Sequence, residues 1–443
     1  RKASHIRGAL LRMALYTLLI PTPLIIVGAL HPKTDHGFVY TVGKNFGLVG
    51  FTILAMQFVL SARLQWIERP FGLNMVFHFH KTMAIVATLL ILLHPMLLAS
   101  DGPQWNLIFG PDIGWHIWLG RIALLVLLMH VLFALFRRVI AINYQTWRFL
   151  HDIGALLLLS LAFIHSWNAG GDLDLMPMRV FWSTLMAAGI SAFGWHRLLR
   201  PLLLRRNPYE VTAVEEEADG VWTITLSPPK GLHRFDFLPG QFHFLTFYRA
   251  KNLPVEEHHW TISSSPTAQG MLASTIKESG DFTVSIGKTK PGDKALVYGP
   301  FGRFSYAFHP DEQDLVFIAG GIGITPLMSM LRHLRDTADD RRVLLLYANR
   351  HEKDIAFRNE LEAMESAGHP GVKVVHVLSQ ASDQWQGEKG PIDLPKIERL
   401  CGSDFPQRAF YLCMPPDAMD AIICSLRSAG VPAKSIHFER FNL

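Results

Sequence analysis

The first 204 residues of this 443-residue chain consist mainly of long apolar runs that carry very few charges. A bilayer core of about 30 Å requires roughly 20 apolar residues for one helical crossing, and several of these runs are that long. After Arg205, acidic and basic residues are interspersed as in an ordinary soluble protein. With 49% hydrophobic and 18% charged residues, the whole chain is too apolar for an ordinary soluble enzyme. The sequence therefore predicts a membrane half followed by a water-soluble half.

Six segments of the first half have the length and composition of a membrane span. We expect a six-helix bundle with spans at 8–30, 46–64, 76–98, 117–136, 149–168 and 179–200. Basic residues gather at alternate loop ends, and the positive-inside rule places those ends, the N-terminus and the soluble half in the cytoplasm. The loops at 31–45, 99–116 and 169–178 then face outward. The basic residues are Arg1, Lys2, Arg7, Arg12, Arg63, Arg69, Arg137, Arg138, Arg148, Arg197, Arg200, Arg205 and Arg206.

The net charge of +5 fits membrane orientation better than nucleic-acid binding, because the basic residues cluster at the ends of apolar runs. We expect an integral protein of a bacterial inner or plasma membrane. Cys401, Cys413 and Cys424 lie in the soluble half without zinc-type spacing, which predicts no disulfide framework and a reducing compartment. The chain begins with Arg1 and not Met, which indicates a processed or partial chain, and no cleavable signal peptide is evident.

Four histidines lie within the predicted spans, where ionisable groups are costly and usually functional. His80 and His94 belong to the third span, and His151 and His165 belong to the fifth. Both pairs are 14 residues apart, so each pair shares one helix face with its members about 21 Å apart along the axis. Facing imidazoles on two parallel spans predict two stacked six-coordinate haems. The alternative is four histidines that hydrogen-bond to Ser, Thr or backbone carbonyls.

Other polar groups of the membrane half fall outside this pattern. We interpret His78 and His130 as structural or interfacial. Iron with two axial histidines has no open position, so an acceptor must take electrons at the haem edge. Several outward residues are suited either to hold haem propionates or to attract an anionic acceptor, or they serve only as solvated loop residues. They are His31, Lys33, His36, His116 and Arg121.

The soluble half changes its pattern near residue 310. Residues 208–308 alternate apolar and polar residues in short runs, which predicts an antiparallel β-barrel. From residue 314, strand and helix patterns alternate, which predicts a doubly wound parallel sheet. The loop GGIGITP at 320–326 follows the first of these strands and opens a helix, as a pyrophosphate site requires. The alternative is a tight strand-to-helix turn.

Two segments of the predicted barrel are suited to a flavin. HHWTISSSP at 258–266 offers an indole face together with hydroxyl and amide donors. IKESGDFT at 276–283 places Lys277 beside a turn at Gly280, Asp281 and Thr283, which offers a cation to a pyrophosphate. The segment FLPGQFHFLTF at 237–247 lies in the same barrel. Each segment alone could be an ordinary β-hairpin.

The paired histidines, HHWTISSSP, GGIGITP, the strand end LCMPP and the terminal HFERFNL together resemble the ferric reductase and NADPH oxidase superfamily over nearly the whole chain. In that superfamily a six-helix haem domain is fused to a ferredoxin-reductase-like module that binds FAD and a nicotinamide nucleotide. The resemblance implies a haem-binding domain at 1–206, a FAD-binding β-barrel at 207–308 and an NAD(P)H-binding Rossmann-like domain at 309–443.

The resemblance also implies a role for individual residues. His80 and His151 would ligate the inner haem iron, and His94 and His165 the outer one. The residues that would hold FAD are His258, Trp260, Thr261, Ser263, Ser264, Lys277, Gly280 and Thr283. Those that would hold the nucleotide are Gly321, Gly323, Thr325, Arg350, Cys413 and Pro415. Phe441 resembles the C-terminal aromatic that stacks on the isoalloxazine, and Cys413, Phe441 and Thr261 are the expected catalytic residues.

Two positions depart from the pattern of the superfamily. Met414 stands where a glycine is usual, and Asn442 and Leu443 follow Phe441. After the second strand of the nucleotide domain, Arg350 and His351 are suited to pair with a 2′-phosphate, which favours NADPH over NADH. An arginine at this place can also cap the next helix. No Ca²⁺-loop pattern is present in the sequence.

The expected activity is electron transfer from cytoplasmic NADPH through FAD and two b-type haems to an acceptor on the outer face. Dioxygen, reduced to superoxide, is the first choice of acceptor. Reduction of a ferric or other metal chelate is the alternative enzyme activity, and relay to an extracytoplasmic protein partner is a third. Oligomeric state and regulatory subunits are not encoded in any pattern of the sequence.

Overall fold

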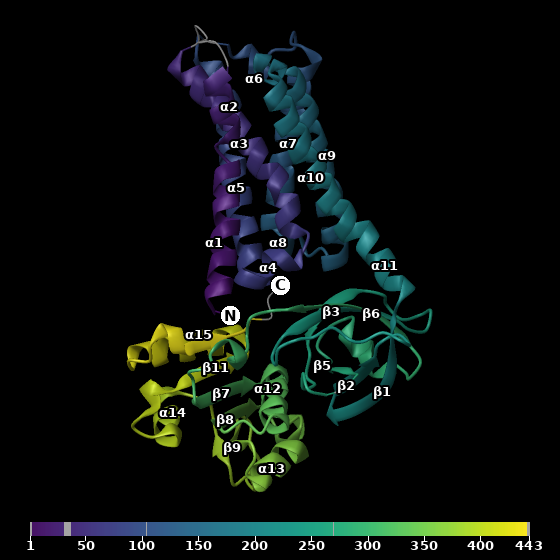
Figure 1. Ribbon diagram of the computed structural model, residues 1–443, viewed down its shortest axis with the longest axis vertical. Coiled ribbons are helices and arrows are strands. Elements are labelled where there is room, and N and C mark those ends of the chain that lie inside the picture. Colours follow the sequence, from purple (N-terminus) through teal and green to yellow (C-terminus); the bar gives the residue numbers. More distant parts are fainter. Residues whose placement is uncertain (1, 31–36, 103, 269, 441–443) are drawn as a thin grey trace. The chain divides into compact units, whose positions relative to one another are not determined.

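The computed structural model describes residues 2–30, 37–102, 104–268 and 270–440 (Figure 1). Its internal contacts divide the chain into two compact units, Arg1–Pro201 and Leu202–Leu443. The predicted boundary at residue 206 falls within helix α11 (Arg200–Arg206), which spans this division.

Helices cover all six predicted spans of the first unit. Four of them, α3, α5, α7 and α9, are long and apolar enough to cross a membrane, and α1 with α2 makes a fifth span if this pair, bent by 43°, counts as one. Helix α10 contains Arg179, Ser183 and Thr184, which lower its hydropathy, so a sixth crossing stays a prediction. The helices are α1 (Lys2–Leu19), α2 (Thr22–Leu30), α3 (Phe38–Ser61), α4 (Gln65–Phe71), α5 (Leu73–Ser100), α6 (Asn106–Phe109), α7 (Trp115–Leu135), α8 (Arg137–Ile140), α9 (Tyr144–Asn168) and α10 (Met176–Gly194).

Glycines allow α3 to pack closely against α5. A Cβ atom added at Gly43 would lie 2.8 Å from the Leu97 Cβ atom, and one added at Gly50 would lie 2.6 Å from Ile91. Small residues at such an interface let two helix backbones approach, which is a common packing mode in membranes. Trp182 of α10 is fully buried, and its indole nitrogen donates to the Ser166 hydroxyl of α9 at 2.8 Å.

The second unit begins with a six-stranded antiparallel sheet, as the alternating pattern predicted. Its strand order is β4-β3-β6-β1-β2-β5, and its core contains Ile224, Leu226, Leu245, Phe247 and Leu272. Alternate side chains of each strand point into this core, which explains the period of two in the sequence. The strands are β1 (Tyr209–Ala218), β2 (Val221–Ser227), β3 (Phe242–Tyr248), β4 (Glu257–Thr261), β5 (Leu272–Lys277) and β6 (Lys294–Phe301).

A six-stranded parallel sheet follows, in the order β10-β9-β8-β7-β11-β12, and confirms the predicted α/β pattern. One apolar core covers each face of this sheet. The chain leaves β7 toward β8 on one side and later returns to β11 on the other, so the strand order reverses at β7. Ligands of such folds bind beyond the carboxyl ends of the strands at this reversal.

The bounds of these elements place that reversal beside the glycine loop at 320–323. The strands are β7 (Asp314–Gly320), β8 (Arg342–Asn349), β9 (Gly371–Leu378), β10 (Glu388–Lys389), β11 (Ala409–Cys413) and β12 (Ile436–Phe438). The helices are α12 (Ile324–Asp336), α13 (Arg358–Ala367), α14 (Leu394–Cys401) and α15 (Pro416–Ser428).

Candidate functional site

The glycine loop after β7 packs directly on the end of β11. Ala319 pairs with Cys413 in the sheet, so the two strands end side by side. A Cβ atom added at Gly323 would lie 2.1 Å from the Cys413 carbonyl oxygen, and one added at Gly320 would lie 2.7 Å from the Met414 Cβ atom. Only glycine fits at these two positions. The structure thus brings together two segments that the sequence analysis assigned to one nucleotide site.

The loop backbone then turns into α12. Gly321 has a φ of +53°, a conformation that favours glycine. The Thr325 hydroxyl donates to the Ile322 carbonyl at 3.1 Å, so this side chain stabilises the first turn of the helix. The amides at the start of a 13-residue helix point away from its body, and their dipoles favour an anion.

Cys413 and Glu439 lie behind this loop. Burial raises the pKa of the Cys413 thiol well above its usual range, and the Glu439 carboxylate raises it further. Cys413 therefore stays protonated and is not a thiolate nucleophile. The Glu439 amide donates to the Leu412 carbonyl at 3.1 Å, which fixes the chain just after β12. Phe441, the predicted stacking residue, lies outside the described residues.

Arg350 and His351 follow β8 and are both exposed. The Arg350 carbonyl accepts from the Gln380 amide at 2.9 Å, and the His351 Nδ1 atom lies 3.2 Å from the Gln380 carbonyl oxygen. The main chain is thus anchored to the segment after β9, while the Arg350 side chain remains open to solvent. A negatively charged ligand at this edge of the sheet can reach it.

An aromatic cluster lies at β4 in the barrel. The ring centroids of His258 and Phe282 are 4.4 Å apart, and those of Trp260 and Phe282 are 5.8 Å apart. The His258 Nε2 atom lies 2.9 Å from a Glu256 carboxylate oxygen. Phe282 was not predicted as a site residue from the sequence. Its place two residues after Gly280, beside the predicted flavin segment, was a usable signal.

The hydroxyl groups after β4 connect this strand to β5. Ser263 is fully buried, and its hydroxyl lies 3.0 Å from the Thr275 hydroxyl. The Ser264 hydroxyl accepts from the Ala273 amide at 3.1 Å, and Thr261 is buried. These side chains therefore shape the strand end from within the barrel. Their contact with a flavin stays a prediction.

The turn at 277–283 is closed by one of its own side chains. The Thr283 hydroxyl accepts from the Ser279 and Gly280 amides, at 2.9 Å each, and donates to the Gly280 carbonyl at 3.2 Å. Two of the amides that a phosphate could use are thus already satisfied within the turn. The Lys277 side chain is half-buried at the end of β5. A pyrophosphate at this turn stays a prediction.

Arg332 links the predicted FAD site to the predicted NADPH site, and its role was not predicted from the sequence. One Nη atom of Arg332 donates to the Ser263 carbonyl at 2.7 Å, and its Nε atom donates to Glu360 at 2.9 Å. The Ser329 hydroxyl, one turn earlier in α12, donates to the Ser264 carbonyl at 2.8 Å. The signal in the sequence was an arginine eight residues after Ile324, on the buried face of an amphipathic helix.

In the membrane unit, His94 and His165 are held in the same way. The Nδ1 atom of His94 lies 2.8 Å from the Gly43 carbonyl oxygen of α3, and that of His165 lies 2.7 Å from the His116 carbonyl oxygen of α7. Because a carbonyl oxygen only accepts, each Nδ1 atom carries the proton, and each Nε2 atom keeps its lone pair. Metal-ligating histidines are commonly oriented in this manner, so the two side chains fit the axial positions of a haem iron.

A glycine lies four residues after each of these carbonyls. A Cβ atom at Gly47 would lie 2.8 Å from the His94 ring, and one at Gly120 would lie 2.6 Å from the His165 ring. Since residues four apart share a helix face, the carbonyl and the glycine form one seat for the imidazole. The helix pairs α3–α5 and α7–α9 repeat this seat. His94 and His165 are also close enough to interact electrostatically.

His80 and His151 form a second pair, which also interacts electrostatically. In the described part of the chain, the buried Nδ1 atom of His151 makes no hydrogen bond, whereas the His80 ring lies beside the main chain of Gln57 in α3. The His151 ring stacks on His130 with centroids 4.2 Å apart, and on Trp147 at 5.1 Å. His130, which we interpreted as structural or interfacial, therefore contacts one of the predicted ligands. The signal was its distance of 14 residues from His116, the same spacing that relates the predicted ligands.

Of the outward groups named above, His31, Lys33 and His36 lie outside the described residues. Arg121 donates to the carbonyls of Leu107 and Asn106 at 3.1 and 2.6 Å and thus holds the short helix α6. His116 contributes its carbonyl to the seat of His165. Both described residues therefore have structural roles close to the outer pair.

Comparison with known proteins identifies the two halves separately. Residues 46–162 match the family described as ferric reductase like transmembrane component, and residues 317–425 match the oxidoreductase NAD-binding domain. A glycine betaine monooxygenase reductase subunit of Pseudomonas aeruginosa is 33% identical over 211 residues, which cover 47% of this chain and 57% of that protein. The chain thus spans little more than half the length of this relative.

Two further similarities are to other reductases. NADH-cytochrome b5 reductase 2 of Mus musculus is 30% identical over 189 residues, which cover 37% of this chain and 68% of that protein. The cytochrome b5 reductase domain of Ulva prolifera nitrate reductase has a TM-score of 0.47 and 23% identity, over 53% of this chain and 98% of that domain.

The segment that matches the transmembrane family contains α5, α7 and most of α9. It includes His80, His94 and His151 and ends before His165. The segment that matches the NAD-binding family contains the glycine loop and the end of β11. An integral membrane component and a reductase module are thus joined in one polypeptide. The chain is an oxidoreductase and belongs to the ferric reductase and NADPH oxidase superfamily.

Proposed function

We propose that this protein transfers electrons from cytoplasmic NADPH, through FAD and two b-type haems, to O₂ on the outer face of the membrane, where superoxide forms. The single observation that supports this proposal best is the repeated seat of His94 and His165. Each Nδ1 atom lies against a backbone carbonyl, and each ring lies against a glycine. When bound, FAD converts a two-electron hydride into single electrons, and haem iron carries these singly.

The membrane unit would hold the haem groups through its histidines. His94 and His165 present their Nε2 atoms as outer ligands, and His80 and His151 are the inner pair. Two histidine ligands would leave the outer iron without a position for an acceptor, so the acceptor would take electrons without binding the metal. A small neutral oxidant needs no binding site of its own there, which favours O₂ as the acceptor.

The nucleotide domain would bind NADPH at the strand reversal. Gly321 and Gly323 let the backbone approach a pyrophosphate, and the amides at the start of α12 offer it hydrogen bonds. The exposed Arg350 guanidinium is placed to pair with a 2′-phosphate. Cys413 and Pro415 would line the nicotinamide side of the site, and the buried, protonated thiol leaves that surface uncharged.

The barrel would hold FAD along β4 and the turn after β5. His258 and Trp260, packed with Phe282, offer a flat aromatic surface. Arg332 and Ser329 bind the main-chain carbonyls of Ser263 and Ser264, so the segment after β4 is attached to the nucleotide domain. The remaining residues proposed to hold the flavin are Thr261, Lys277, Gly280, Thr283 and Phe441.

Reduction of a ferric chelate is the second candidate activity, and the match of residues 46–162 to a ferric reductase like component favours it. Both activities use the same internal path and differ only in the final acceptor. The orientation proposed here, with the soluble unit in the cytoplasm of a bacterial cell, applies to both.

The test measures NADPH oxidation by the detergent-purified, FAD-supplemented protein with and without oxygen. Superoxide is followed as cytochrome c reduction that superoxide dismutase suppresses. We expect fast oxidation that requires oxygen and is sensitive to the dismutase. Oxidation that proceeds only with ferric citrate would establish the second candidate. Absence of haem from the purified protein would contradict both.

A further inference from the structure

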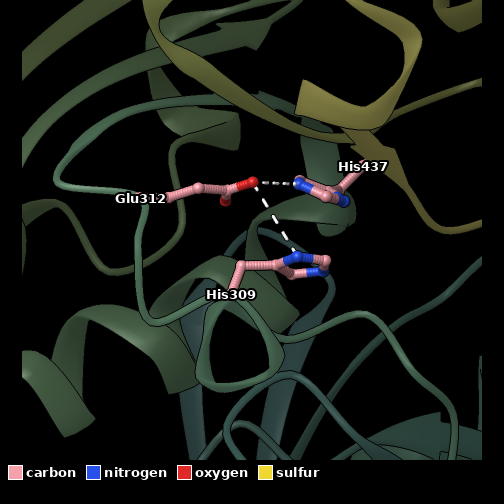
Figure 2. Close-up of side chains that lie close together, drawn as sticks. All are labelled: His309, Glu312 and His437. Atoms are coloured by element: carbon pink, nitrogen blue, oxygen red, sulfur yellow. Dashed lines mark hydrogen bonds and ion pairs between the residues drawn. The ribbon is translucent and has the colours of Figure 1, made fainter. Parts of the chain in front are cut away.

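Two histidines and a glutamate converge at the amino-terminal side of the nucleotide domain, away from the glycine loop at the other end of β7. His309 and Glu312 precede β7, and His437 lies in β12 (Figure 2). One ligand atom from each of the three lies within 4.8 Å of the other two. The His437 Nε2 atom is 2.8 Å from Glu312 Oε1, and the His309 Nδ1 atom is 3.8 Å from the same oxygen.

We propose that His309, Glu312 and His437 bind a Zn²⁺ ion. Two imidazole nitrogens and one carboxylate oxygen are a common donor set for this ion, which leaves a fourth position for water. Ligand bonds of roughly 2.0–2.2 Å in a tetrahedral arrangement separate the donor atoms by about 3.4 Å. The observed separations of 2.8 and 3.8 Å lie on either side of that value, so small side-chain movements complete the site.

The surroundings of Glu312 suit a metal ligand. Its second carboxylate oxygen accepts from the Tyr411 hydroxyl at 2.6 Å, the kind of outer contact that orients a ligating carboxylate.

The two imidazole rings face the carboxylate together. Their centroids are 4.0 Å apart, and Figure 2 shows both rings directed at the same end of the Glu312 side chain. The side chains of His309, Glu312 and His437 retain 31%, 18% and 15% of their exposure, so an ion can enter from the His309 side. A divalent cation between the rings would neutralise the carboxylate and bind one nitrogen of each ring.

Such an ion would join segments that are distant in the sequence. His309 and Glu312 belong to the connection between β6 and β7, whereas His437 is 125 residues after Glu312 in the short edge strand β12. Beyond the pairing of β12 with β11, the Glu439 amide fixes the following residues. The ion would thus fasten the C-terminal strand to the start of the nucleotide domain, independently of electron transfer.

The test uses the full-length purified protein after treatment with a chelator. Zn²⁺ binding is measured by competition with a chromophoric chelator, and Co²⁺ is added as a spectroscopic probe of tetrahedral coordination. We expect the wild-type protein to bind one more ion per chain than the Glu312→Gln and His437→Gln variants do. Matched controls are His376→Gln, a half-buried histidine of β9, and Cys424→Ser, an exposed thiol, both of which should bind as the wild type does.

A second variant keeps the test decisive if loss of Glu312 prevents folding. Tyr411→Phe leaves all three donor atoms and removes only the hydrogen bond to Glu312, so the affinity should fall by about 10- to 100-fold. Equal stoichiometry and affinity in the wild type, Glu312→Gln and Tyr411→Phe would overturn the proposal. The three side chains would then form only a hydrogen-bonded connection to β12.

Discussion

The two histidine pairs of the membrane unit have the same spacing but are positioned in different ways. His94 and His165 each donate from Nδ1 to a backbone carbonyl, at 2.8 and 2.7 Å, and lie against a glycine. The Nδ1 atom of His151 makes no such bond among the described residues, and its ring is instead stacked on His130. Backbone atoms therefore orient the outer pair, whereas neighbouring rings orient His151 in the inner pair.

This difference shows what an equal spacing does and does not determine. The 14-residue interval brings each histidine to the same helix face as its partner in the sequence. The tautomer and the direction of each ring depend on the facing helix, which supplies a carbonyl in one case and an aromatic ring in the other.

Removal of a ligand should give the largest effect. We expect His94→Ala and His165→Ala to halve the haem content per chain, because the proposed outer haem would lose one of its two ligands. NADPH should still reduce the flavin, since the soluble unit is unchanged. Pyridine haemochrome absorbance measures the haem content, and diaphorase activity measures flavin reduction. A variant that keeps both haems would show that the assignment of ligands is wrong.

Obstruction of the nucleotide site should slow the reduction of the two proposed haems equally. The Cβ atom of Gly323→Ala would meet the Cys413 carbonyl oxygen at 2.1 Å, so the loop must move away from β11. We expect kcat/KM for NADPH to fall by at least about 10-fold, the effect of roughly 1.4 kcal/mol on the barrier. Haem content should not change. A loss of one haem in this variant would contradict the separation of the two units' roles.

Glycine substitutions that crowd one histidine should affect the outer and the inner haem differently. Gly120→Ala would place a Cβ atom 2.6 Å from the His165 ring, and Gly154→Ala would place one 2.7 Å from His130 Nδ1. We expect the first to lower outer haem occupancy and the second to alter only the inner haem. The matched control is Gly194→Ala, whose added Cβ atom would meet nothing within 4 Å. Redox titration followed by absorbance resolves the two haems.

The stacking partner of His151 should have a smaller influence. His130→Phe keeps an aromatic ring 4.2 Å from His151 but removes its two nitrogens. We expect a shift of the inner midpoint potential without loss of haem, because ring stacking is retained. The outer potential should stay at its wild-type value. A shift of both potentials by the same amount would show that His130 acts on the whole bundle.

A change of pH should affect the stability of the barrel through His243. Burial lowers the pKa of His243 from 6.5 to about 3, so its neutral form is favoured in the folded state. Its contribution to stability is complete above pH 6.5 and decreases as the pH falls toward 3, by up to about 1.4 kcal/mol per pH unit. Denaturant midpoints measured through flavin release should therefore fall less with acid in His243→Asn than in the wild type. Parallel curves would contradict this account.

The sequence predicted the features that depend on local periodicity. The positions of the apolar helices, the alternation of the barrel strands and the glycine loop at 320–323 all follow from short-range patterns, and the structure contains each of them. The closeness of GGIGITP to LCMPP was also predictable, because parallel strands end at one edge of a sheet.

Contacts between distant segments were not predictable in the same way. The position of Arg332 beside Ser263 depends on how α12 packs against the barrel, which no local pattern specifies. His309, Glu312 and His437 meet only because the edge strand β12 returns beside β11. The closure of the 279–283 turn by Thr283 likewise depends on a side-chain rotamer and not on composition.

The most direct test of the account follows the absorption spectrum of the FAD-loaded protein after NADPH is added without oxygen. The account predicts that flavin absorbance decreases first and that two haems per chain then become reduced, and that His165→Ala shows only one. Decrease of the flavin absorbance with no change in the haem bands, or a purified protein without haem, would contradict the proposed path across the membrane.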